Sequence, residues 1–192
     1  MNGVREIVRQ SIYDTYVISP SGGAVVTGDW DFFKVPIGQT VGSYTKTLLD
    51  TNLDTAGTLP FESAKLVGLR AFLYVRGAGT VTPTDFNQIF NHTVIELKKE
   101  DRLIMREPLA KIPAGYGAVG AVSTGTGTTG DVAVMSNGMA LKSNFYDIFT
   151  EDFKKTDRLQ LQVKNMVAMA GVVATTLYLR LELECEISKE VR

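Results

Sequence analysis

The sequence predicts a single all-β domain, and three observations support this prediction. Residues 177–187 alternate apolar and polar side chains without interruption, which is typical of a long strand with one buried face. Several other segments show the same period, whereas helical periodicity is confined to two short segments. The chain has 192 residues, 44% of them hydrophobic and 21% charged, which suits one folded domain with one substantial core.

The predicted strands follow one another along the chain and are separated by turns. Glycines mark two of these turns, at residues 38–42 and 77–79. A polar tripeptide at residues 99–101 reverses the chain and predicts a hairpin. Nine candidate segments predict about eight strands; they are 30–37, 44–49, 65–76, 93–98, 103–105, 132–135, 139–141, 159–163 and 177–187.

A further tight hairpin is predicted around Asn137-Gly138, because Asn-Gly favours the positive φ angles of a two-residue turn. This hairpin would pair residues 132–135 with residues 139–141. Just before it, residues 123–131 are rich in Gly and Thr and of low complexity. They predict a loop that is flexible or becomes ordered on assembly.

Two short segments favour helix. Thr82, Pro83 and Asp85 combine capping residues with an early proline, which predicts one or two helical turns crossing between strands. The N-terminus also has helical spacing, with Val4, Ile7, Val8 and Ile12 on one face and Arg5, Glu6, Arg9 and Gln10 on the other. We therefore expect an N-terminal arm at residues 1–20 and one domain at residues 21–192. The arm would dock on a neighbouring subunit, lie against a membrane surface or pack on its own core.

Charge and cysteine content exclude several classes of protein. Lys and Arg number 20 and Asp and Glu number 21, so no excess positive charge would draw the chain to nucleic acid. Cys185, the single cysteine, excludes an internal disulfide and is expected to be a small buried hydrophobe. No stretch has the length of an apolar membrane span, and the first ten residues lack the apolar core of a signal peptide.

The glycine patterns do not predict a nucleotide site. Gly115, Gly117 and Gly120 satisfy the bare dinucleotide-binding pattern, but a Gly-Thr loop follows where that fingerprint needs a helix. In a phosphate-binding loop, lysine and a hydroxyl residue would follow Gly130, and here Asp131 and Val132 follow it. We expect no cofactor.

No catalytic constellation is apparent, and we do not expect an enzyme. His92 is the only histidine, which excludes a histidine-rich metal centre within one chain, and we place it in a turn or on the surface. Glu182, Glu184 and Glu186 fall between apolar residues, so they are expected to form a solvated or subunit-contacting row. Glu151-Asp152 would lie in a loop, and two acids make a weak cation site.

The order of the elements resembles a viral single jelly roll, in which two four-stranded sheets pack face to face. The chain is most similar to the small major capsid proteins of tailless, membrane-containing icosahedral bacteriophages of the sphaerolipovirus kind. The local likenesses are DTAGTLP at residues 54–60, PLAKIPAGYG at 108–117 and the approach to a strand at 149–163. The resemblance implies an eight-stranded single jelly-roll sandwich with an arm and one short crossing helix.

The resemblance also implies a viral structural protein that self-assembles into the capsid shell of the virion. Its partners would be copies of itself in capsomers, a second capsid protein, a minor vertex protein and an internal viral membrane, without specific nucleic acid. Tyrosine offers a large contact area with a polar tip, which makes it a good interface anchor. The candidate interface residues are Arg5, Arg9, Tyr13, Tyr16, Tyr116 and Tyr146.

Three other interpretations remain open at this point. Jelly rolls also occur as carbohydrate-binding modules, in which Trp30, Tyr44 and Tyr74 would form an aromatic platform for a sugar. A receptor-binding or decorating virion protein would share the same sequence features as a shell subunit. An enzyme would need a composite site between chains, with His92 or Glu151 at the interface.

Overall fold

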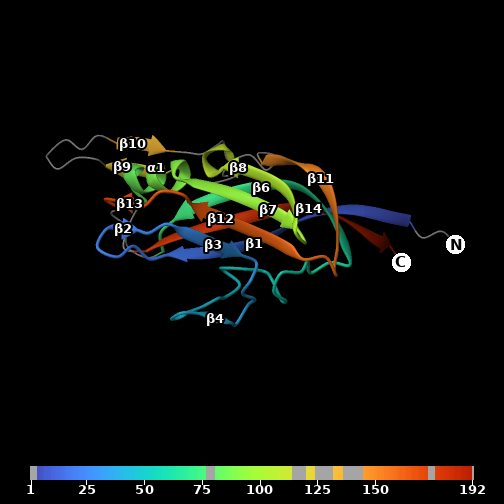
Figure 1. Ribbon diagram of the computed structural model, residues 1–192. Helices are drawn as coiled ribbons and strands as arrows, with labels where there is room; N and C mark the ends of the chain where they lie inside the picture. The colour runs from blue at the N-terminus through green and yellow to red at the C-terminus, as the bar shows by residue number, and fades with distance from the viewer. Residues whose placement is uncertain are drawn as a thin grey trace.

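The computed structural model describes residues 4–76, 81–113, 120–123, 132–135, 145–172 and 176–191. Two four-stranded antiparallel sheets form a β-sandwich (Figure 1). Sheet one has the order β1 (Val4–Ile18), β14 (Leu177–Val191), β6 (Ser63–Tyr74) and β11 (Tyr146–Lys154). Sheet two has the order β3 (Gly28–Phe32), β12 (Leu159–Asn165), β7 (Thr93–Lys99) and β8 (Arg102–Pro108).

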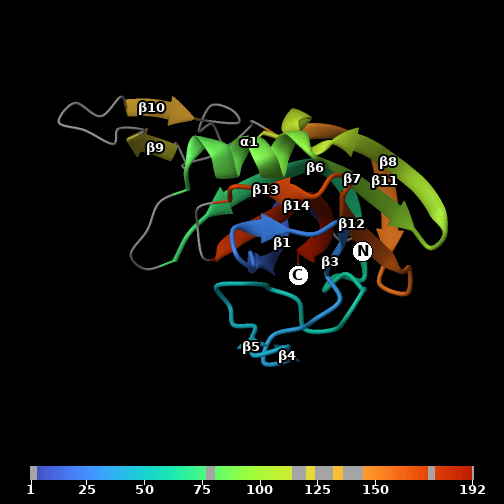
Figure 2. The same cartoon turned by 60° about the vertical axis from the view of Figure 1, so that its left-hand side comes forward.

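Three two-stranded pairs, one α-helix and one 3₁₀ turn complete the described part of the chain. The pairs are β2 (Ala24–Val25) with β13 (Met169–Ala170), β4 (Thr40–Val41) with β5 (Tyr44–Thr45), and β9 (Gly120–Ser123) with β10 (Val132–Met135). The helix is α1 (Pro83–Asn91), and the 3₁₀ turn is η1 (Leu109–Lys111). Figure 2 places β4 and β5 in a lobe outside the sandwich, beside β1 and β3. In the described ranges, no helix has the length and apolar character to cross a membrane.

The core lies between the inner faces of the two sheets and follows the predicted alternation. In β14, the apolar residues from Leu177 to Ile187 are all at most 5% exposed, as the sequence predicted. In sheet two, Leu159, Leu161 and Val163 are buried in the same way. The predicted all-β class is confirmed, because side chains two residues apart share one face of a strand and can bury an apolar row together.

Helix α1 forms where its capping residues predicted it. The Thr82 hydroxyl accepts a hydrogen bond from the backbone N of Asp85, and the Asp85 carboxylate accepts one from the backbone N of Thr82. This reciprocal pair satisfies two donors that the first helical turn leaves without partners. The last turn buries Ile89 and Phe90 against the core.

The predicted helical arm is wrong at the level of secondary structure, because residues 4–18 form a strand. β1 pairs antiparallel with β14 along its whole length, from Val4 opposite Val191 to Ile18 opposite Leu177. Residues four positions apart lie on one face of a strand as well as on one face of a helix, so Val8 and Ile12 fit both periods. The available partner strand decided between them.

Beyond the pairing of Glu186 with Lys65, β14 has only β1 beside it among the described strands. Residues 4–8 and 187–191 therefore form a two-stranded ribbon, which projects from the sandwich near both termini (Figure 1). We refer to these residues as the terminal ribbon.

The predicted turns had mixed outcomes. The hairpin at residues 99–101 is confirmed, with Glu100 at a φ of 52° between β7 and β8. Of residues 44–49, only Tyr44–Thr45 is strand, and the chain turns at Thr47. Val132–Met135 is a strand, but it pairs with Gly120–Ser123; the predicted partner at residues 139–141, the Asn137-Gly138 turn and most of the loop at 123–131 lie outside the described residues.

Candidate functional site

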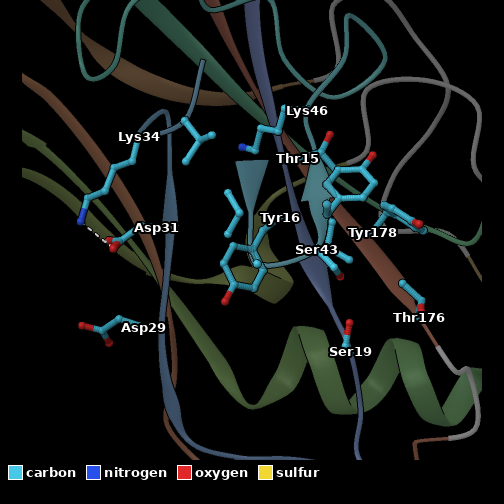
Figure 3. Close-up of a pocket in the computed structure, with 15 residues that line it drawn as sticks. Thr15, Tyr16, Ser19, Asp29, Asp31, Lys34, Ser43, Lys46, Thr176 and Tyr178 are labelled. Carbon is cyan, nitrogen blue, oxygen red and sulfur yellow. Dashed lines mark ion pairs between the residues drawn. The ribbon is translucent and has the colours of Figure 1, made fainter. Parts of the chain in front are cut away.

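A pocket of about 620 Å³ opens beside β1, between β3 and the lobe that carries β4 and β5 (Figure 3). Tyr16 of β1 lies in it, and its ring stacks on Trp30 with centroids 5.7 Å apart. Asp29 and Asp31 come from β3, and Asp31 forms an ion pair of 2.5 Å with Lys34. The lining combines aromatic rings, carboxylates and hydroxyl groups, which suits a polar or amphipathic occupant. Its residues are Thr15, Tyr16, Val17, Ser19, Asp29, Asp31, Lys34, Val35, Val41, Gly42, Ser43, Tyr44, Lys46, Thr176 and Tyr178.

A buried ion pair attaches the lobe to the sandwich beside this pocket. Lys46 Nζ lies 2.5 Å from Asp14 Oδ1, and the side chains are 6% and 0% exposed. The other Asp14 oxygen accepts a 2.6 Å hydrogen bond from the backbone N of Phe33. Burial raises the pKa of Asp14 above its ordinary value, although Lys46 acts in the opposite direction. The pair closes the edge of the sandwich between β1 and β3.

A cluster of tyrosine and arginine side chains covers the outer face of sheet one next to the pocket. The Arg76 guanidinium lies 4.4 Å from the ring centroid of Tyr178 and 5.6 Å from that of Tyr74. It also forms an ion pair with Asp50, which accepts a 2.5 Å hydrogen bond from Tyr44. Cation–π contacts and charged hydrogen bonds together hold these groups in one arrangement.

The pKa values in this cluster shift in the directions that its contacts require. Burial would raise the pKa of Asp50, but hydrogen bonds from Tyr44, Thr47 and Arg76 lower it below its ordinary value. Burial and the hydrogen bond to Asp50 raise the pKa of Tyr44. The groups therefore keep their usual charges at neutral pH, which favours a binding or structural role over proton transfer.

Arg180 extends the cluster toward β1. It lies 5.0 Å from the ring centroid of Tyr13, and its guanidinium donates to the backbone carbonyl of Leu49. The Tyr13 hydroxyl donates to the carbonyl of Leu48 at 2.6 Å. Arg76 and Arg180 were not among the predicted site residues. A signal was available, because each arginine follows a tyrosine by two residues: Tyr178 and Arg180 lie on β14, and Tyr74 ends β6 two residues before Arg76.

The structure separates most of the predicted interface residues. Tyr13 joins the tyrosine and arginine cluster, whereas Tyr16 lies in the pocket. Arg9, on the outer face of β1, forms a 2.9 Å ion pair with Glu186 and is 55% exposed. Tyr146 lies at the start of β11, where burial and a hydrogen bond to Glu107 raise its pKa. Tyr116 and the side chain of Arg5 lie outside the described residues.

The predicted aromatic platform is wrong, because Trp30, Tyr44 and Tyr74 do not lie together on one exposed surface. Trp30 is only 5% exposed and stacks against Tyr16. Tyr44 and Tyr74 instead belong to the cluster around Arg76. The reason is the alternation in β3, which turns Trp30 and Phe32 inward together.

The predicted solvated row on β14 is also wrong for two of its three glutamates. Glu182 and Glu184 are 5% and 8% exposed, and Glu184 lies 3.0 Å from Arg70 Nη1. The Arg70 guanidinium in turn lies 5.6 Å from the centroid of the Phe145 ring. An outer sheet face is solvated only where no other side chain covers it, and alternation does not report this cover.

The candidate catalytic residues do not converge. His92 caps the C-terminus of α1, whereas Glu151 lies 3.8 Å from Lys99 at the opposite end of β7. Glu151 and Asp152 belong to β11, so the expected loop is wrong. No group of three His, Cys, Asp or Glu residues that could hold a metal occurs in the described part of the chain. Cys185 is buried, as predicted, and burial raises its pKa to about 12.

Comparisons of this chain with family models, with curated proteins and with solved structures returned no match.

Proposed function

We propose that this protein is a structural subunit of a virion shell, built as an eight-stranded single jelly roll that assembles with copies of itself. The order of strand pairing is the observation that carries this proposal. Among the strands of the two large sheets, taken in chain order, the first pairs with the last, the second with the seventh, the third with the sixth and the fourth with the fifth.

This pairing order is the expected result when one long antiparallel hairpin rolls up into two sheets, which defines a jelly roll. The order supports a jelly roll over other β-sandwiches, because each of the four strand pairs is a separate observation that agrees with it. Viral shell proteins are a large class with this architecture, although lectins and cupins share it. The resemblance of residues 54–60, 108–117 and 149–163 to phage capsid proteins favours the shell among these classes.

The terminal ribbon supports a role in assembly. A two-stranded ribbon without a third strand is marginally stable in water, so contact with a neighbouring molecule would stabilise it. Ile7 in this ribbon is 71% exposed. Exposed apolar side chains on an unpaired strand edge favour association with another chain. Copies of the chain, a second capsid protein or a minor vertex protein could supply that contact, and an internal membrane could lie beneath the shell.

Light scattering of the native protein over a range of concentration and salt, followed by electron microscopy of the same samples, tests self-assembly. We expect the mass to grow with concentration and the images to contain rings, sheets or closed shells. A protein that is monomeric under every condition would overturn self-assembly and leave a carbohydrate-binding module to be tested on a glycan array.

Two matched variants test the part played by the terminal ribbon. Ile7→Lys places a charge on an exposed apolar position of the ribbon and is expected to weaken assembly. Val26→Lys is the control, because Val26 is 78% exposed and follows β2 at the other end of the sandwich (Figure 1). Equal assembly by both variants would exclude the ribbon from the contact.

A further inference from the structure

Two adjacent leucines are exposed to solvent on the turn that follows β5. Leu48 is 66% exposed and Leu49 is 69% exposed, although neighbouring Lys46 and Asp50 are buried. Isolated exposed leucines are common on protein surfaces, whereas contiguous exposed apolar surface is typical of interaction sites. We refer to Leu48 and Leu49 as the leucine knob.

The backbone of the leucine knob is held by hydrogen bonds on both sides. The Asp50 carboxylate accepts hydrogen bonds from the backbone N and the hydroxyl of Thr47, at 2.8 and 2.9 Å. Tyr13 donates to the carbonyl of Leu48, and Arg180 donates to that of Leu49. A knob that is already ordered loses little conformational entropy when it binds. These contacts therefore fit a preformed interface anchor.

The pocket of Figure 3 lies next to the leucine knob and shares its supports. Tyr44 and Tyr178 line the pocket, and the Arg76 guanidinium lies within 6.0 Å of both ring centroids while it donates to the carbonyl of Leu49. Three valines, Val17, Val35 and Val41, add apolar surface to the lining. One surface of the protein thus presents an apolar projection, with Arg180 beside it, next to a hollow whose lining combines aromatic rings and valines with carboxylates and hydroxyl groups.

The charges beside the knob and in the pocket are complementary. Arg180 holds the knob but forms no ion pair with any carboxylate of the described residues. Asp29 lines the pocket, and no cation of the described residues forms an ion pair with it. Opposite charges that face each other across an interface favour the correct partner and orientation.

We propose that two copies of this chain form a twofold dimer in which the leucine knob of each copy enters the pocket of the other. A twofold axis makes such a contact reciprocal, because each surface carries both the knob and its receptor. Arg180 of one copy then approaches Asp29 of the other. This inference rests on the proposed self-assembly and names one of the contacts that builds it.

Disulfide trapping between two different variants tests the contact. Leu48→Cys protein, which changes the knob, is mixed with Ser43→Cys protein, which changes the pocket, and the mixture is oxidised. Cys185 does not interfere because it is buried. We expect a cross-linked product that contains one chain of each variant, identified by different mass tags. Leu103→Cys with Ser43→Cys is the control, because Leu103 is also exposed, at 42%, but lies on β8.

Light scattering of the same proteins separates the inference from the proposed function. Leu48→Asp is expected to weaken dimerisation about tenfold or more, because it places a charge where the proposed dimer buries a leucine. Leu103→Asp is expected to leave dimerisation unchanged. Association without the specific cross-link would overturn the dimer contact and leave self-assembly standing. A wild-type protein that stays monomeric would overturn both. Glycan-array binding that Ser43→Trp abolishes, without cross-linking, would assign the pocket to a saccharide and overturn the dimer contact.

Discussion

The outer faces of the two sheets differ in how they bury charged side chains. On sheet two, Glu96 is 2% exposed, yet it lies 2.7 Å from Arg106 and 3.3 Å from both Lys98 and Lys164. These three cations are themselves partly exposed, so their charges stay hydrated. On sheet one, Arg70 is 4% exposed and lies between Glu182 and Glu184, which are buried with it.

This difference has an energetic consequence. Where several partly hydrated cations surround one carboxylate, the loss of one cation leaves the others to neutralise the carboxylate. Among the described residues, one buried cation lies between the two buried carboxylates of sheet one, and its removal leaves negative charge in a region of low polarity. The two faces therefore differ in how strongly the fold depends on one side chain, and this contrast can be tested.

The largest expected effect is that of Arg70→Met. The substitution removes the guanidinium that contacts both buried carboxylates, Glu182 and Glu184, and is expected to lower the free energy of unfolding by about 3 to 5 kcal/mol. Urea unfolding followed by circular dichroism measures it. Lys98→Met on sheet two is the matched control, expected to cost less than about 1 kcal/mol because Glu96 keeps two other cations. Equal losses would show that the two faces do not differ in this way.

The next effect comes from the cover that makes sheet one different. A Cβ atom added at Gly68 would lie 2.1 Å from a carbon of the Phe145 ring. Gly68→Ala is therefore expected to displace Phe145 and to destabilise the fold by about 1 to 3 kcal/mol.

A double variant distinguishes this clash from a general effect on β6. In a Phe145→Ala background, Gly68→Ala should cost much less, because the ring that it meets is absent. An additive double-mutant cycle, measured by thermal unfolding, would contradict the role of Phe145 as the cover.

Two buried carboxylates should respond to pH with opposite sign. Burial raises the pKa of Asp14 above 3.8, so its contribution to stability is greatest below that pH and falls as the pH rises through the raised value. Although burial alone would raise the pKa of Glu96, hydrogen bonds from Lys164, Arg106 and Lys98 lower it below 4.5. Its contribution is present above that pH and is lost as the pH falls through the lowered value.

Urea unfolding across a pH series, for the wild type, Asp14→Asn and Glu96→Gln, measures these contributions. The advantage of the wild type over Asp14→Asn should fall with rising pH, and its advantage over Glu96→Gln should rise. Slopes of the same sign would contradict the opposite pKa shifts of Asp14 and Glu96.

The smallest expected effect belongs to the exposed pair of Arg9 and Glu186. Arg9→Ala should change the free energy of unfolding by less than about 1 kcal/mol, because Arg9 is 55% exposed and Glu186 is 26% exposed. Arg9 and Glu186 pair directly beside the terminal ribbon, so if the ribbon is an assembly contact the same variant should alter association, and light scattering would detect this. A large loss of stability with no change in association would contradict this assignment.

The strongest predictions from the sequence concerned residues whose neighbours along the chain decide their structure. The alternation at residues 177–187, the capping residues Thr82 and Asp85 and the reversal at residues 99–101 all act over a few positions. For that reason the all-β class, the short helix and one hairpin were predictable. The spacing of Val8 and Ile12 satisfied two periods, and the local sequence could not decide between them.

What the sequence determined by itself was therefore the alternation of β12 and β14 and the apolar side chains that these strands place in the core, because side chains two residues apart share one face of a strand. The tertiary structure alone decided which polar residues became buried. Phe145 covers Arg70, and the turn at residues 47–50 brings Asp50 to Arg76, from positions far apart in the chain. The candidate site depends on such contacts, since strand pairing and loop paths bring its residues together.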